Sequence, residues 1–225
     1  MIFQNGWFPV GVVMAAWPVL LVIFALCAKQ AWVSVSQHRS AFLVAAVMLP
    51  LAWSLNASPE SGQLAGMSYH LLALNLTALM LGTSAAFCLG VLFFLPYLWL
   101  WGDWHMFPIN ALSVLLPPLL VNLGFRCWVS RLPANIFIFI FLNGFWSAAV
   151  GMVFTGVILV GLLDWVDVFD TSVLWKTAFP VFFLIAWAEA FLSGISTAIF
   201  IALKPQWICT FDDDRYLKSA PKIWQ

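Results

Sequence analysis

Few side chains in this sequence could do chemistry, and one of them stands inside an apolar run. Glu189 lies midway along the last such run, within Ile-Ala-Trp-Ala-Glu-Ala. An ionisable side chain is costly inside a bilayer and is by default a candidate for function. Two interpretations stay open. Glu189 is a proton, cation or subunit-contact group, or it is a protonated or hydrogen-bonded glutamate that holds helices together.

Two histidines and an aspartate beside other apolar runs could bind a metal ion. His70 stands at the start of the third run, and His105 follows Gly102 and Asp103. Imidazole is the commonest metal ligand among side chains near neutral pH, and Asp103 could orient or share such a site. A single histidine is more often a surface or core residue with satisfied hydrogen bonds. A metal site and a structural histidine therefore both stay open.

The sequence motifs of common enzymes are absent. There is no H-E-x-x-H helix, no G-x-S-x-G elbow and no Walker-type phosphate loop. The chain therefore does not hydrolyse ATP unaided, and no permanently bound cofactor is expected. Nine basic and nine acidic residues cancel, so net charge predicts no nucleic-acid partner. Four scattered cysteines lack any C-x-x-C pairing.

The elements that must position these side chains are membrane helices. Of 225 residues, 64% are hydrophobic and 8% are charged, and the mean hydropathy is +1.01. A soluble domain carries about 25% charged residues, because charge keeps its surface hydrated. Lipid must therefore replace water around most of this chain. The apolar runs are long and continuous, which predicts helices and not the short alternating strands of a membrane barrel.

Seven apolar runs can be distinguished. They are Val10–Ala28, Ala41–Leu55, Ser68–Leu81, Ser84–Trp101, Pro108–Phe125, Asn135–Leu163 and Trp175–Leu203. The second and third are short and could be tilted at an edge or sunk in protein, so six spans is the alternative. The adjacent Pro117 and Pro118 are predicted to interrupt the fifth helix, and a merely kinked packing helix is the alternative. We predict an all-α polytopic membrane domain over residues 1–208, followed by a short cytoplasmic tail over residues 209–225.

Basic and acidic residues fall largely on opposite sides of the membrane if the N-terminus is outside and the C-terminus is cytoplasmic. Eight of the nine basic residues then fall in cytoplasmic segments, and Lys176 falls outside. Cytoplasmic loops carry the excess of Lys and Arg in membrane proteins. The pattern therefore predicts a multi-pass protein with its N-terminus outside.

Small residues recur at every fourth position of the last run. They are Ala186, Ala190, Gly194, Ala198 and Ala202. Such a stripe lets a second helix approach closely. That helix belongs either to this chain, as internal packing, or to a partner protein to which the stripe couples.

Several short motifs occur in the order and spacing of a known family. The chain opens with Met1-Ile-Phe-Gln-Asn-Gly, has His70-Leu-Leu-Ala and Leu-Met-Leu-Gly82 in its third run, and continues with Gly102-Asp103, Asn110-Ala-Leu, Ala188-Glu189-Ala and Leu203-Lys-Pro205. In this collinear set, residues 1–208 resemble the CbiM/NikM family. Its members are the substrate-binding membrane subunits of energy-coupling-factor (ECF) importers for cobalt and nickel.

The resemblance implies a metal site on the outer face. Family members hold the ion with the N-terminal amine, with the backbone and imidazole of a histidine at position 2, and with the histidine that opens the third span. Nitrogen donors in a near-planar array suit Ni(II). The amine of Met1 and the imidazole of His70 carry over. Position 2 is Ile2, so His105, Asp103 or a methionine would have to complete the site.

Three functions follow as hypotheses. The resemblance implies a permease subunit of a prokaryotic plasma (inner) membrane, which binds a Ni- or Co-like cation and works with a transmembrane coupling protein and ATPase subunits. A scaffold or assembly subunit of the same fold, without metal transport, is favoured by Ile2. An intramembrane enzyme or redox subunit would use Glu189 and the histidines.

Overall fold

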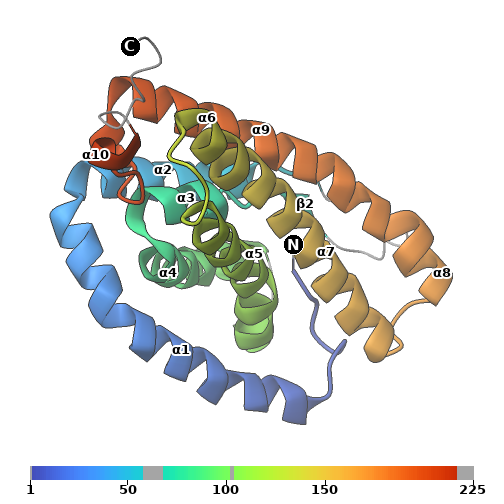
Figure 1. Cartoon of the computed structure of the whole chain (residues 1–225). Coiled ribbons are helices and arrows are strands. Elements are labelled where there is room, and N and C mark those ends of the chain that lie inside the picture. Colours follow the sequence, from blue (N-terminus) through green and yellow to red (C-terminus); the bar gives the residue numbers. More distant parts are fainter. Residues whose placement is uncertain (1, 58–67, 102–103, 217–225) are drawn as a thin grey trace, which may run out of the picture.

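The protein is a bundle of helices in the computed structural model, which describes residues 2–57, 68–101 and 104–216 (Figure 1). The longer helices are α1 (Val10–Gln37), α2 (Arg39–Ser54), α3 (Leu74–Leu81), α4 (Thr83–Trp101), α5 (Phe107–Val129), α7 (Ser147–Trp165) and α9 (Phe179–Leu203). The short elements are β1 (Asn56–Ala57), β2 (Tyr69–His70), η2 (Trp104–Met106), α6 (Ile136–Ile138), η3 (Phe139–Trp146), α8 (Thr171–Val173), η4 (Leu174–Ala178), η5 (Pro205–Trp207) and α10 (Asp213–Tyr216). The elements η3 and η4 are π-helical and continue directly into α7 and α9.

Five segments in the described part of the chain are long and apolar enough to cross a membrane. They are Val10–Gln37, Thr83–Leu100, Trp104–Val129, Ile136–Trp165 and Thr171–Leu203. A crossing takes about 20 residues, and α2 is apolar but shorter. The predicted all-α, polytopic membrane architecture is confirmed. The number of complete crossings and the N-out orientation stay predictions.

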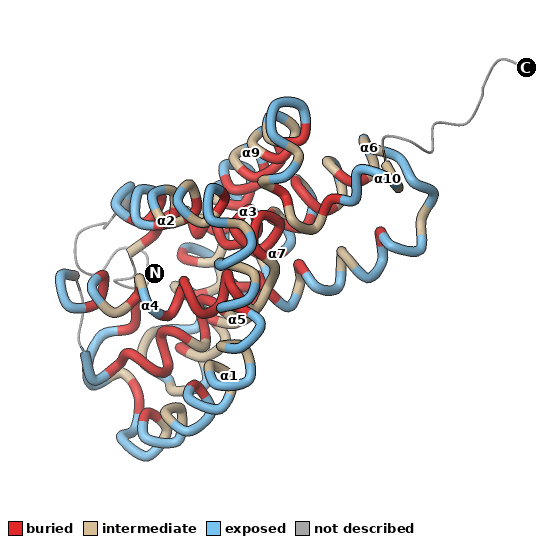
Figure 2. The backbone as a smooth tube through the Cα atoms, turned by 90° about the vertical axis from the view of Figure 1, so that its left-hand side faces the viewer, coloured by how far each residue is buried: buried red, intermediate tan, exposed pale blue. Residues whose placement is uncertain are grey.

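The prediction of a continuous third span over Ser68–Leu81 is wrong. Its first part is extended, since β2 pairs antiparallel with β1, and the helix α3 has only eight residues. Eight residues rise about 12 Å, less than half of a hydrocarbon core of about 30 Å. Every residue of α3 is buried, and the helix contacts α2, α4, α5, α7 and α9 (Figure 2). The segment is therefore a half-helix sunk in protein.

The two prolines of α5 do not interrupt it, contrary to the prediction. α5 is continuous, and both Pro117 and Pro118 are buried within it. A proline removes one helical hydrogen bond, but neighbouring helices accommodate such sites in membrane bundles. Gly151 of α7 provides the room here, because a Cβ atom at this position would lie 3.2 Å from the Cα atom of Pro118.

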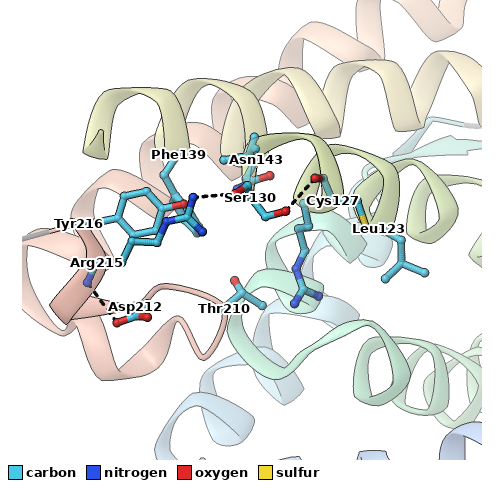
Figure 3. A pocket seen from close by; sticks show the side chains of 11 residues that line it. Leu123, Cys127, Ser130, Phe139, Asn143, Thr210, Asp212, Arg215 and Tyr216 are labelled. Carbon is cyan, nitrogen blue, oxygen red and sulfur yellow. Dashed lines mark hydrogen bonds between the residues drawn. The ribbon is translucent and has the colours of Figure 1, made fainter. Parts of the chain in front are cut away.

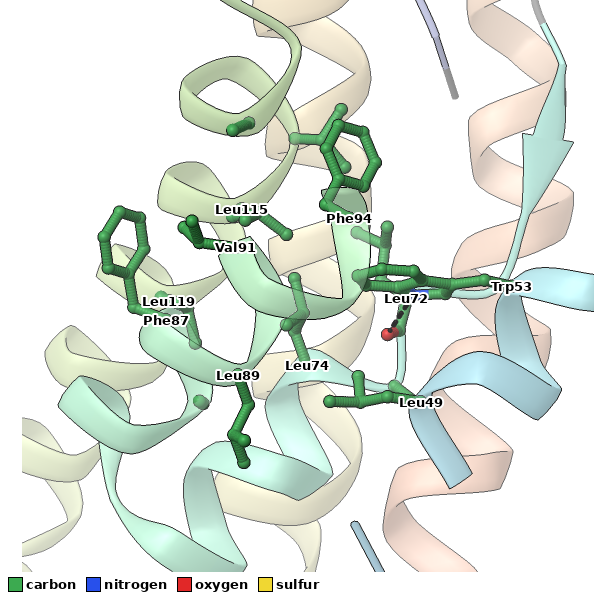
Figure 4. Packing of buried hydrophobic residues seen from close by; sticks show 14 of the residues in the cluster. Leu49, Trp53, Leu72, Leu74, Phe87, Leu89, Val91, Phe94, Leu115 and Leu119 are labelled. Atoms are coloured by element: carbon green, nitrogen blue, oxygen red, sulfur yellow. Dashed lines mark hydrogen bonds between the residues drawn. The ribbon is translucent and has the colours of Figure 1, made fainter. Parts of the chain in front are cut away.

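The centre of the bundle is apolar, and so is much of its outside. Leu74 of α3, Phe94 of α4 and Leu115 of α5 are fully buried and pack in one cluster (Figure 4). α1 runs along the edge of the bundle, where Leu26 is 74% exposed and Trp32 is 76% exposed (Figure 1). Soluble proteins rarely expose contiguous apolar surface of this kind, so the outer face suits lipid.

The first part of the predicted cytoplasmic tail is folded against the bundle. The ring of Phe211 is buried and packs on the ring of Phe139 in η3, with 5.1 Å between centroids. The guanidinium of Arg215 donates to the carbonyl oxygen of Ser130, just after α5, at 2.8 Å. The chain up to Tyr216 therefore continues the structure of the membrane domain.

Candidate functional site

His70 lies deep in the bundle at the loop between β2 and α3. Its side chain is 2% exposed, and its ring lies beside those of Trp53 and Tyr97, with centroid distances of 6.1 and 5.3 Å. The Nδ1 atom is 2.9 Å from the carbonyl oxygen of Leu71. Because a carbonyl can only accept, Nδ1 carries the proton. Nε2 is buried with no hydrogen-bond partner among the described residues, so its lone pair is available in the neutral ring.

This arrangement meets one requirement of a histidine that binds a metal ion. Such a histidine almost always donates its other ring N–H to a carboxylate, a carbonyl or water, which fixes the tautomer and the ring orientation. The carbonyl of Leu71 does this for His70. The geometry therefore presents Nε2 as one nitrogen donor, and further donors must come from other groups.

The N-terminal segment is inserted into the same bundle. Ile2 is 8% exposed and Phe3 is 1% exposed. The N–H of Phe3 donates to Oδ1 of Asn110 at 2.6 Å, and Nδ2 of Asn110 donates back to the Phe3 carbonyl at 3.2 Å. One amide of α5 thus pairs both backbone groups of Phe3, as a neighbouring strand would. Met1, whose amine is a predicted ligand, lies outside the described residues.

Glu189 of α9 binds the backbone at the start of the half-helix. Its Oε2 accepts from the N–H of Leu72 at 2.9 Å, and its Oε1 accepts from the N–H of Ala73 at 2.7 Å. The first N–H groups of a helix have no partner inside the helix. Ala73 is the N-cap residue of α3 and has a left-handed φ of 53°. The Glu189 carboxylate thus links α9 to the start of α3.

Two carbonyl groups of this loop are also paired. Nε1 of Trp53 donates to the carbonyl of Leu72 at 2.9 Å (Figure 4). The carbonyl of Ala73 accepts from the N–H and the hydroxyl of Thr77, at 3.1 and 2.9 Å. Buried backbone groups are costly when unpaired. These bonds therefore hold the loop in one conformation and fix the position of the imidazole.

Asn75 of α3 is the centre of a buried network that the sequence analysis missed. Its Nδ2 donates to two consecutive carbonyls of η3, at 2.9 and 3.2 Å, and to Oγ of Ser193 in α9 at 2.8 Å. Its Oδ1 accepts from Nδ2 of Asn122 in α5 at 2.8 Å and from Oγ of Ser147 in α7 at 2.7 Å. One amide thus joins the half-helix to three membrane helices.

A signal of this network is present in the sequence. Asn75, Asn122 and Asn143 each interrupt an apolar run, and a polar side chain in a membrane helix usually bonds across to another helix. The side-chain amides of Asn75 and Asn122 bond to each other across 47 residues of chain, whereas Asn143 takes part through its backbone carbonyl, 68 residues from Asn75. No local spacing predicts these pairings.

The other predicted ligands either lie apart from His70 or fall outside the residues that the structure describes. His105 is exposed and lines a surface cavity of about 410 Å³ with Asn5, Trp17 and Met106, among others. His70 is not part of that lining. Asp103 lies outside the described residues. Within the described ranges, no three His, Cys, Asp or Glu side chains form a group that could hold a metal ion.

Part of the small-residue stripe of the last helix faces this chain's own helices, whereas Ala202 is exposed. Ala190 and Gly194 are buried, and Ala198 is half-buried. A Cβ atom on Gly194 would lie 3.1 Å from the Cβ atom of Phe145 in η3. At Ala190 and Gly194, the stripe therefore packs internally.

A second cavity lies at the opposite end of the half-helix from the His70 loop. It measures about 310 Å³ and lies between α5, η3 and the folded tail (Figure 3). Its polar lining comprises Arg126, Ser130, Asn143, Thr210, Asp212 and Arg215. The hydroxyl of Thr210 also donates to the carbonyl of Leu79 at 2.9 Å. The half-helix is thus held at its C-terminal end by the tail and at its N-terminal end by α9.

Fold and site together define a class of protein: a polytopic helical membrane protein whose buried half-helix carries an imidazole at its N-terminal end. Residues 3–207 match the CbiM family, described as the cobalt uptake substrate-specific transmembrane region. The chain belongs to this family. It is a membrane component of cobalt uptake, and it is a transport protein and not an enzyme.

A solved structure has the same fold. It is described as a truncated transition metal transporter, and it superposes with a TM-score of 0.67 over 91% of this chain and 99% of that chain. The two sequences are 16% identical. No curated protein matches the chain significantly.

Proposed function

We propose that this chain is the substrate-specific subunit of an ECF-type importer, and that it binds a divalent Ni- or Co-like ion at His70 on the outer face. The observation that carries the proposal is the buried Nε2 of His70, which has no partner among the described residues while Nδ1 donates to Leu71. Imidazole nitrogen is a suitable donor for both ions. The ion is the transported substrate and not a resident cofactor.

The N-terminal segment is the source of further donors in this proposal. A series of aromatic contacts connects the region of Asn110, which binds this segment, to His70. The ring of Phe107, three residues before Asn110, lies 6.4 Å from that of Phe94, which lies 5.6 Å from that of Trp53 beside His70. Both features therefore belong to one end of the bundle, which supports a site that also uses the amine and the first backbone groups.

A scaffold subunit without metal transport is the second candidate, and Ile2 favours it. The side chain of Ile2 is buried and is apolar, so it offers no donor where the resembling family has an imidazole. An Ile2→His variant discriminates between the two candidates. A gain of nickel binding from an undetectable level would support the scaffold, whereas binding by the unaltered chain supports the transporter.

Titration calorimetry of the purified chain with NiCl2 and CoCl2 tests the proposed site. The unaltered chain should bind one ion, and His70→Ala should weaken binding at least about tenfold, since even outer-shell changes cost this much. His105→Ala is the matched control and should bind normally. Equal binding by the unaltered chain and by His70→Ala would overturn the site.

The proposed partners follow from what the sequence lacks. It has no phosphate-binding loop, so ATP-driven uptake requires separate ATPase subunits and a transmembrane coupling protein. The chain should co-purify with these subunits from a prokaryotic plasma membrane. Nickel uptake into vesicles that hold this chain alone would contradict the proposed assembly.

A further inference from the structure

We propose that Glu189 provides the counter-charge for the metal ion at His70 and is the positioning residue for the His70 loop. This inference rests on the proposed function, because it assigns a role toward the ion bound at His70. It starts from the two hydrogen bonds of the Glu189 carboxylate to the N–H groups of Leu72 and Ala73.

The carboxylate lies close to His70 through the chain itself. Leu72 follows His70 by two residues, so its backbone nitrogen lies at most about 6 Å from the Cα atom of His70. With the 2.9 Å bond from this nitrogen to Oε2, the carboxylate lies at most about 9 Å from the Cα atom of His70. The bond between Nδ1 of His70 and the carbonyl of Leu71 lies within the same short segment. Glu189 therefore fixes the backbone that orients the ring.

Among the described residues, the one donor assigned to the proposed site is the imidazole of His70, which carries no negative charge when it binds a metal. A buried charge is unfavourable unless it is paired. The N-terminal end of α3 adds a partial positive charge at the same place. Within the described ranges, Glu189 is the only Asp, Glu, Lys or Arg side chain that is buried. Its negative charge can thus offset both the partial positive charge at the end of α3 and the charge of a divalent cation.

A purely structural role for Glu189 is the alternative, and Ser193 offers the matched control. Ser193 is one turn further along α9, is 1% exposed, and also bonds to α3, through Nδ2 of Asn75 at 2.8 Å. It is neutral. If Glu189 only fastens α3 to α9, loss of either side chain should affect metal binding alike.

The test compares nickel binding by calorimetry and thermal unfolding for full-length Glu189→Gln and Ser193→Ala. Glu189→Gln keeps the volume but removes the charge, and its Kd for Ni²⁺ should rise about 10- to 100-fold, as for other residues behind metal ligands. Ser193→Ala should lower the unfolding temperature but leave the Kd within about threefold, because the ligand-bearing loop and its counter-charge are intact. A Glu189→Gln variant that binds like the unaltered chain, or a Ser193→Ala variant that loses as much, would overturn the inference.

Glu189→Asp supplies a second arm if Glu189→Gln does not fold. It retains the charge, and its Kd should stay within about tenfold of the unaltered chain. A loss as large as that of His70→Ala would overturn the counter-charge role. If the unaltered chain binds nickel through His70 and these variants fail their expectations, the inference alone is wrong. If the unaltered chain binds no nickel, the proposed function and this inference fall together.

Discussion

Gly156 of α7 and Phe182 of α9 are in direct contact, because a Cβ atom on Gly156 would lie 2.5 Å from Cγ of Phe182. Phe182 is fully buried. Close approach of this kind is what small residues permit in membrane bundles. The absence of a side chain at one position of α7 thus sets the packing of the helix that carries Glu189.

Gly156→Ala should therefore destabilise the fold. The added methyl group has no room, and overpacking of a core typically costs about 1–3 kcal/mol. Gly161→Ala, in the same helix, is the control, because nothing lies within 4 Å of its added Cβ. It should be neutral or stabilising by up to about 1 kcal/mol, since Ala has the higher helix propensity. Thermal unfolding in detergent measures both, and equal stabilities would contradict the close contact.

Asn75→Leu should destabilise the protein more than any single surface change. It leaves the amide of Asn122 and the hydroxyl of Ser147 without their acceptor, and each unpaired buried group costs about 1–3 kcal/mol. The expected loss is at least about 2 kcal/mol in the free energy of unfolding.

Thr197→Val is the matched control for Asn75→Leu. Its hydroxyl is buried and has no partner among the described residues. Removing an unpaired polar group should be neutral or stabilising. If both variants lose equal stability, the network around Asn75 is not the source of the effect.

The thiols on the predicted cytoplasmic side should differ in reactivity. Burial raises the pKa of Cys209, although the charge of Arg126 opposes this. Only the thiolate reacts, so labelling of Cys209 by a maleimide should be slow at pH 7 and should accelerate as the pH rises toward its raised pKa. Cys127 is exposed and should react first. Cys127→Ser and Cys209→Ser variants assign the two rates, and a faster Cys209 would contradict its half-buried position.

The same reagent tests the predicted orientation. A maleimide that does not cross membranes should label Cys127 in inverted vesicles and spare it in intact cells, because Cys127 neighbours Arg126 in a segment predicted to be cytoplasmic. Labelling in intact cells would place this segment outside and reverse the orientation.

Arg215→Ala should release the folded tail. The guanidinium donates to the carbonyls of Ser130 and Leu132, at 2.8 and 3.2 Å, and both bonds are lost with it. Chymotrypsin should then cut faster after Phe211. Asp213→Ala, an exposed neighbour, should leave the rate unchanged. Equal rates for both variants would show that the tail is held by its aromatic contacts alone.

The membrane class and the approximate positions of the helices could be predicted from hydropathy, because apolar length is a local property of the sequence. The short length of the third run gave the alternative that it is sunk in protein, but the bounds of the half-helix could not be predicted. Leu74–Leu81 is as apolar as a lipid-facing helix, and only its tertiary surroundings show that it is buried. His70 was predicted from its residue type and the family resemblance. The bonds that orient it come from Glu189 and Trp53, and the network of Asn75 depends on residues far apart in the chain.

The half-helix also constrains the order in which the protein assembles. Its N-terminal amides are satisfied by Glu189, 116 and 117 residues later in the sequence, and its carbonyl at Leu79 by Thr210, 131 residues later. Unpaired backbone groups are not tolerated in lipid. During synthesis, residues 68–81 therefore cannot adopt their final hydrogen-bonded structure when they leave the ribosome. They must stay in water or in the insertion machinery until the last helix arrives, so the end of the bundle that carries His70 forms only when the chain is nearly complete.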